Sequence, residues 1–129
     1  MKISTPISTG ELLDKLSITE IKLKKIKDQV KLDLISLEKD ALQETLEDSL
    51  SSYGNKDERL SELLCVNEKL WIIEDSIRNK EKNKEFDEEF IELARAVYFT
   101  NDERFVIKNK INNETGSLIQ EQKSYEEYK

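Results

Sequence analysis

The 129-residue chain carries 28 acidic and 21 basic residues and no histidine, which gives a formal net charge of −7. Charged residues make up 38% of the chain and hydrophobic residues 36%, a balance typical of helices that bury a narrow stripe and leave their outer faces in water. The acidic excess argues against nucleic acid as a partner, and the lack of histidine removes the commonest general base and imidazole-based zinc sites.

A single cysteine, Cys65, cannot form an internal disulfide, which fits a reducing compartment. No apolar run in the sequence is long enough for a membrane span, and no N-terminal stretch has the pattern of a signal peptide. We therefore expect one cytoplasmic domain over residues 1–129, without a membrane partner, a bound metal or a cofactor.

The N-terminal segment, residues 1–9, is expected to be extended, because Pro6 disfavours a helical residue before it. A capping box that begins at Ser8 then predicts the start of a helix. The run over residues 11–50 contains no Pro or Gly and predicts one long helix, or two helices that meet at a kink near residues 36–40.

This long run carries two apolar faces. One stripe recurs at steps of mostly three, four or seven: Leu12, Leu16, Leu23, Ile26, Val30, Leu34, Leu37 and Ala41. A second set lies about 100° or more around the axis: Ile35, Leu42, Leu46 and Leu50. Two apolar faces require two partners, or a break that rotates one face relative to the other.

The length of this helix points to a partner chain. An unbroken helix over this run would span roughly 60 Å, whereas a compact domain of this size has a diameter of only about 36 Å. We therefore expect a homodimer. Its candidate interface is the N-terminal part of the helix: Leu12, Leu16, Ile18, Ile21 and Leu23.

After a loop at residues 51–56, a second helix is expected over residues 58–82, with an apolar seam at steps of three and four. A third helix capped by Asp87 should break at residues 100–103, where a Thr-x-x-Glu pattern predicts a new helix over residues 102–112. This helix would then end at residues 112–116, and the tail, residues 117–129, would contain a short helix at 118–122. The fold class is an all-α antiparallel bundle of three or four coiled-coil-like helices, built on the long N-terminal helix.

Polar residues on the second and third helices recur at helical spacing. Arg95, Tyr98 and Asp102 share one side of an unbroken helix, and Trp71, Glu74 and Arg78 share one side of the preceding helix. These side chains could line a pocket, or they could form a salt-bridge and hydrogen-bond network that sets the register of the helices.

A short acidic run, Glu88-Glu89-Phe90-Ile91-Glu92, is similar to the Glu-Glu-x-x-Glu motif of all-α nucleotide pyrophosphohydrolases, which hold Mg²⁺ with carboxylates from two helices. Those enzymes also carry a downstream Glu-x-x-Asp, and this chain has none after Glu92.

Four longer stretches carry a second resemblance: GELLDK at residues 10–15, LWIIEDSIR at 70–78, FIELARAVYFTNDER at 90–104 and EQKSY at 121–125. Together they resemble an uncharacterised domain-of-unknown-function family of small all-helical bacterial and phage proteins, some encoded near polysaccharide genes. The resemblance covers nearly the whole chain and implies no established activity, substrate or cofactor.

Many of the matched positions are polar, which suggests a charged pocket for a small anionic or sugar-like ligand. The candidate pocket comprises Asn67, Trp71, Glu74, Arg78, Arg95, Tyr98, Asn101, Asp102, Arg104 and Lys108. The preferred interpretation is nevertheless a self-associating protein-interaction or structural module that is not an enzyme. Two alternatives stay open, a ligand-binding protein or small enzyme that uses this pocket, and an Mg²⁺-dependent pyrophosphohydrolase.

Overall fold

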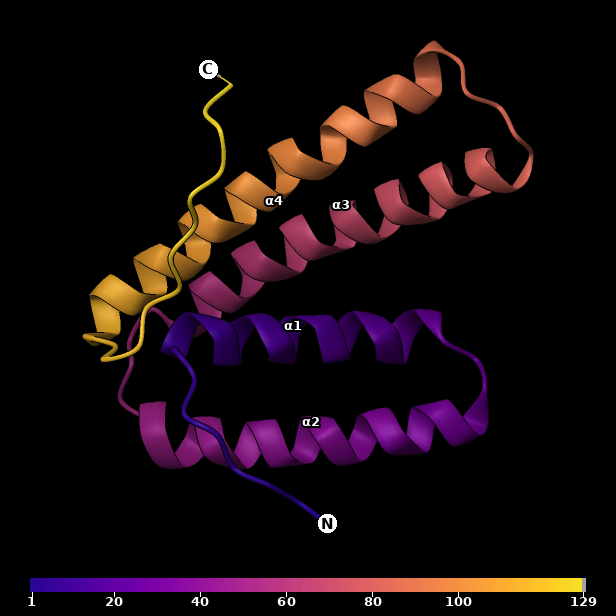
Figure 1. The fold of residues 1–129 in the computed structure, drawn as a ribbon. Coiled ribbons are helices and arrows are strands. Elements are labelled where there is room, and N and C mark those ends of the chain that lie inside the picture. The colour runs from indigo at the N-terminus through magenta and orange to yellow at the C-terminus, as the bar shows by residue number, and fades with distance from the viewer. Residues whose placement is uncertain (129) are drawn as a thin grey trace.

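The computed structural model describes residues 1–128, so Lys129 of the expected tail lies outside the described residues. Within the described residues the chain forms no strand and four helices: α1 (Thr9–Lys25), α2 (Gln29–Leu50), α3 (Lys56–Lys82) and α4 (Glu88–Thr115). The helices form two antiparallel hairpins, α1–α2 and α3–α4, and the second hairpin diverges from α1 toward its own loop (Figure 1). The all-α bundle expected from the sequence is therefore confirmed.

The prediction of a single long N-terminal helix is wrong, and so is the prediction of a kink at residues 36–40. The chain leaves α1 at Ile26, whose φ of −84° and ψ of 138° are extended, and α2 starts after Asp28. The Asp28 carboxylate accepts the backbone N–H groups of Val30 at 3.0 Å and Lys31 at 3.5 Å. This cap satisfies donors that a new helix leaves open, so the chain reverses without Gly or Pro.

The reversal makes α1 the central helix, because it packs against each of the other three helices. The core gathers around α1: Leu12, Leu13, Leu16, Leu46, Leu63, Val66 and Ile111. The expected subunit interface therefore lies largely inside the chain. Leu12, Leu16 and Ile21 are at most 3% exposed, and Ile18 and Leu23 are half-buried.

The second hairpin follows the sequence more closely. Helix α3 covers the expected range, and α4 begins at its expected cap, where Asp87 accepts the Phe90 N–H at 3.0 Å. Gly116 ends α4 in the left-handed conformation, with φ of 64°.

The predictions of a break at residues 100–103 and of a helix at 118–122 are both wrong. Helix α4 continues through residues 100–103, and residues 117–128 contain no helix. Thr100 is 1% exposed on the inner side of α4, and Arg104 and Lys108 continue that side at steps of four, so the capping pattern lies within a continuous packed face.

Candidate functional site

The contact between α1 and α4 is set by a small residue. A Cβ added at Gly10 would lie only 2.4 Å from the carbonyl oxygen of Lys108, so glycine is required for this close approach. The Gly10 N–H donates to the side-chain oxygen of Asn112 at 2.7 Å. The start of α1 is thereby joined to the last turns of α4.

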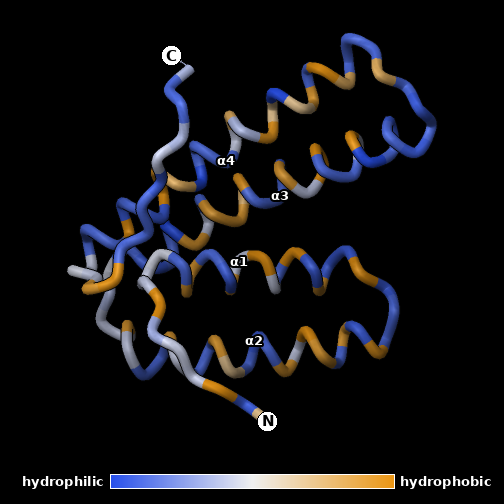
Figure 2. The backbone as a smooth tube through the Cα atoms, viewed as in Figure 1, coloured by the Kyte–Doolittle hydropathy of each residue, from blue (hydrophilic) through white to orange (hydrophobic). Residues whose placement is uncertain are grey.

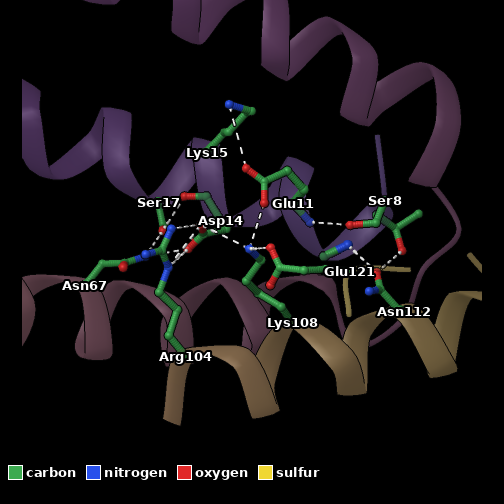
Figure 3. A network of polar contacts seen from close by, with 12 residues as sticks. Ser8, Glu11, Asp14, Lys15, Ser17, Asn67, Arg104, Lys108, Asn112 and Glu121 are labelled. Atoms are coloured by element: carbon green, nitrogen blue, oxygen red, sulfur yellow. Dashed lines mark hydrogen bonds and ion pairs between the residues drawn. The ribbon is translucent and has the colours of Figure 1, made fainter. Parts of the chain in front are cut away.

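One turn further along α1, Asp14 is the centre of a polar network (Figure 3). Its carboxylate is fully buried and accepts hydrogen bonds from Arg104, whose Nε lies 3.0 and 3.1 Å from the two oxygens and whose Nη2 contacts Oδ2. Asn67 of α3 donates to Asp14 at 2.8 Å and to the Ser17 hydroxyl at 2.7 Å. The buried charge is thus paired and hydrogen-bonded from two neighbouring helices, as a buried carboxylate requires.

Lys108 extends the network to the tail (Figure 3). Its ammonium lies 2.7 Å from Glu11 of α1, 3.1 Å from Glu121 of the tail and 3.9 Å from Asp14. Burial lowers the pKa of Lys108, but the hydrogen bond to Glu11 and the charges of Asp14 and Glu11 outweigh burial, so its pKa lies above the usual value. Lys108 therefore stays charged and holds the tail against α1.

The charged side chains of this network form ion pairs with one another. Three carboxylates, Glu11, Asp14 and Glu121, surround the two cations Arg104 and Lys108. The hydrogen bonds to Asp14 raise the pKa of Arg104 above its usual value although burial opposes them. Both cations are paired with carboxylates of the chain itself. This arrangement fits a network that sets the register of the helices better than a site that binds an anionic ligand.

A groove of about 430 Å³ lies between α1, α3 and α4, and half of the predicted pocket residues line it. These are Asn67, Trp71, Glu74, Asn101 and Arg104. Of the charged residues that line this groove, Arg104 is basic, and Glu74 and Asp75 are acidic.

The remaining predicted residues lie elsewhere. Tyr98 and Asp102, together with Asn101, line a second hollow that faces the tail. Arg78 lies on α3 with its Nε 3.4 Å from Glu74, and the Arg95 guanidinium lies 5.6 Å from the centroid of the Phe99 ring. With Lys108 in the buried network, the structure divides the predicted pocket instead of bringing it together.

Several residues of the network were missed in the sequence-based pocket: Glu11, Asp14, Ser17, Asn112 and Glu121. A signal for part of it exists, because Gly10, Asp14 and Ser17 follow one another at steps of four and three and so share one side of α1. Small and polar residues on one side of an otherwise apolar helix predict a polar contact with a neighbouring helix.

The acidic run at the start of α4 gives no metal site. Glu88, Glu89 and Glu92 are exposed, and Glu89 lies 3.2 Å from Lys80 of α3. Among residues 1–128, no group of three or more Asp, Glu or Cys side chains is arranged to hold a metal ion. Nor is any helix of this described part long and apolar enough to cross a membrane.

An exposed apolar surface lies on α2, outside the interface that the sequence predicted on residues 12–23. Val30, Leu34 and Leu37 are 70%, 63% and 67% exposed, and they follow one another at steps of four and three. Apolar residues recur along the whole of α2, which packs chiefly against α1 (Figures 1 and 2). This stripe, with the half-buried Ala41, is called the outer face of α2 below.

The comparisons with known proteins agree with the resemblance seen in the sequence. A family model described as "Family of unknown function (DUF6165)" matches residues 1–128. No curated protein and no solved structure matches the chain.

Proposed function

The chain belongs to the family of unknown function DUF6165, and we propose that it is a self-associating interaction module whose contact surface is the outer face of α2. The exposure of Val30, Leu34 and Leu37 carries this proposal. The buried network then has a structural role, since it holds α3, α4 and the tail to α1, the helix against which α2 packs.

Helix α2 has one apolar side that packs on the core and another that is exposed, so the exposed residues form a continuous surface and not isolated apolar side chains. Leu42 and Leu46 pack on the core around α1, and Leu46 is 2% exposed. At about 100° per residue, their side of the helix lies roughly 130° around the axis from the outer face. A helix that is apolar on two separate sides needs a partner on each, and within the described chain only one side has it.

A second copy of the chain is the partner that this face fits. Steps of four, three and four from Val30 to Ala41 match the seam of an antiparallel helix pair, in which Leu34 of one copy lies beside Leu37 of the partner subunit. In this register Lys31 approaches Glu38 of the partner subunit, and the two-fold axis repeats the favourable pair.

The same register also contains an unfavourable pair. Asp33 and Asp40 are exposed on the other flank of the outer face, and the two-fold axis brings them close to each other across the interface. Like charges at such flanking positions weaken the pairing. The register is therefore testable through Asp40.

The size of the surface predicts a weak dimer. Each partially exposed Val or Leu gains about 1–2 kcal/mol when it is buried, and the two copies contribute six such side chains. Association costs at least about 4 kcal/mol, which leaves a dissociation constant of about micromolar at best. The dimer should therefore form on concentration from low to several hundred micromolar protein.

Light scattering across this concentration range tests the proposal. The wild type should rise toward twice the chain mass of 15.1 kDa, and Leu34→Glu should stay at the monomer mass. Ile72→Glu is the matched control, because Ile72 is 56% exposed on α3 and lies outside the outer face. A monomer at every concentration would contradict the proposal, and a dimer lost with Ile72→Glu would place the interface on α3 instead.

The charge pattern gives an independent test of the register. Asp40→Lys replaces two like-charge pairs with attractive ones, so the dissociation constant should fall severalfold. Glu81→Lys makes the same charge change at an exposed position of α3 and serves as the control. An equal effect of both variants would show that net charge, not the pairing of Asp33 with Asp40, controls association.

A further inference from the structure

Helix α4 and the C-terminal tail border an open hollow of about 910 Å³ in which aromatic rings gather. Tyr98 and Phe105 of α4 line it together with Tyr125 and Tyr128 of the tail. The ring centroids of Tyr98 and Tyr128 lie 5.1 Å apart in an edge-to-face arrangement. Tyr98 and Tyr125 are 43% and 77% exposed, so a ligand could reach these rings from solvent.

The charges of the hollow favour a positive ligand. Asp102, Glu126 and Glu127 line it, and Lys123 is its only lining cation among the described residues. The Tyr128 hydroxyl donates a hydrogen bond to Asp102, which raises the pKa of Tyr128 to about 12. Aromatic faces attract cations through their negative quadrupole, and the surrounding carboxylates add to that attraction.

Cations of the chain already lie over aromatic rings that line the hollow or contact its lining. The Lys123 ammonium lies 5.2 Å from the centroid of Phe105 and 5.8 Å from that of Tyr125. The Arg95 guanidinium lies 5.6 Å from the centroid of Phe99, whose ring contacts Tyr128 at 5.2 Å between centroids. All three distances are within the range of about 6 Å over which a cation gains from a ring face.

We propose that this aromatic and acidic hollow binds a small organic cation through an alkylammonium group, and that the side chain of Lys123 is its internal occupant. A compact ammonium with an apolar surface gains from the rings and the carboxylates together, whereas a neutral molecule of the same shape gains only from burial. Ring contacts at partly exposed sites are weak, so a simple cation should bind with a dissociation constant of about millimolar or above.

Choline and its neutral isostere 3,3-dimethylbutan-1-ol separate charge from shape. In a nitrogen-15 NMR titration of the full chain at constant ionic strength, choline should shift the amide signals of residues 123–128 and of α4 near Asp102. The neutral alcohol should bind at least about tenfold more weakly, which corresponds to 1.4 kcal/mol. Equal binding of both, or no binding of choline, would overturn the proposal.

Two variants of exposed lysines test the role of Lys123. Lys123→Met removes the internal occupant and should lower the dissociation constant for choline severalfold, whereas Lys110→Met removes an exposed lysine of α4 outside the hollow and should leave it unchanged. Asp102→Asn should weaken binding. Co-sedimentation with phosphatidylcholine vesicles would overturn the assignment to a free small molecule, because the same group would then come from a lipid headgroup.

Discussion

Replacement of Asp14 by Asn removes the central charge of the buried network and changes little else. The Asp14 carboxylate is fully buried, and Arg104 and Asn67 donate to it. Asn keeps the size of the side chain but leaves the Arg104 guanidinium without its main counter-charge and places two amide groups against each other. The variant therefore measures how much the network contributes to the free energy of unfolding.

The magnitude follows from the burial of the two partners. Loss of one partner of a buried ion pair typically costs about 3–5 kcal/mol. The Arg104 side chain is 27% exposed and can regain some water, which favours the lower end, about 3 kcal/mol. For a domain of this length that loss corresponds to roughly 10 °C in melting temperature.

Urea unfolding followed by circular dichroism measures the change, with Asp75→Asn as the control. Asp75 is exposed on α3, so its replacement should cost less than about 0.5 kcal/mol. The double variant Asp14→Asn, Arg104→Gln should lose less than the two single losses added together, because both remove the same interaction. If Asp14→Asn and Asp75→Asn cost the same, the network does not hold the helices together.

Three further changes test other parts of the fold. Glu114→Gln removes the carboxylate that Arg59 holds by hydrogen bonds, with a Glu114 pKa of about 2 against an ordinary 4.5. Because the pKa of Glu114 is depressed in the folded state, its stabilisation is complete above pH 4.5 and disappears as the pH falls through about 2. In urea unfolding, the free energy of unfolding should therefore be larger for the wild type than for the variant at pH 7, and the two values should converge near pH 2. Gly10→Ala should lower the melting temperature, because its Cβ would collide with the backbone of Lys108, and a gain from higher helix propensity would refute this. Asp28→Ala should cost about 1 kcal/mol in the free energy of unfolding, since it removes the cap of α2, whereas an unchanged value would show that the turn does not depend on that cap.

The helices themselves were largely predictable from hydrophobic periodicity. The seam of α3 and the caps at Ser8, Asp87 and Gly116 are local signals, and the structure uses each of them. The turn at residues 26–28 was not predictable in this way. The apolar stripe continues through it from Leu23 to Val30, and the only signal of the break is one capping aspartate.

The ion-pair network was only partly predictable, because periodicity ranks apolar residues. Arg104 and Lys108 were placed in a pocket, but their partners Asp14 and Glu11 on α1 were left out of it, since spacing along one helix does not show which helix faces it. Glu121 lies in a tail without helical structure, so no spacing rule could bring it to Lys108. Both contacts depend on the turn that makes α1 central.

The interface expected from the sequence differs from the contact surface that we propose on α2. An α helix with two apolar sides indicated a partner, but the interface was assigned to residues that the turn buries, such as Leu12 and Leu16. Once the chain reverses at residues 26–28, the unpartnered apolar side moves to α2 and its exposed leucines.

The most direct test of the outer face of α2 as a self-association surface is cross-linking between single cysteines. In a Cys65→Ser background, Leu34→Cys and Leu37→Cys chains are mixed at several hundred micromolar and treated with a short bismaleimide. Antiparallel pairing through this face predicts that the mixed 34–37 product forms faster than the 34–34 product. Equal rates, or no cross-link at concentrations where scattering shows a dimer, would contradict the account.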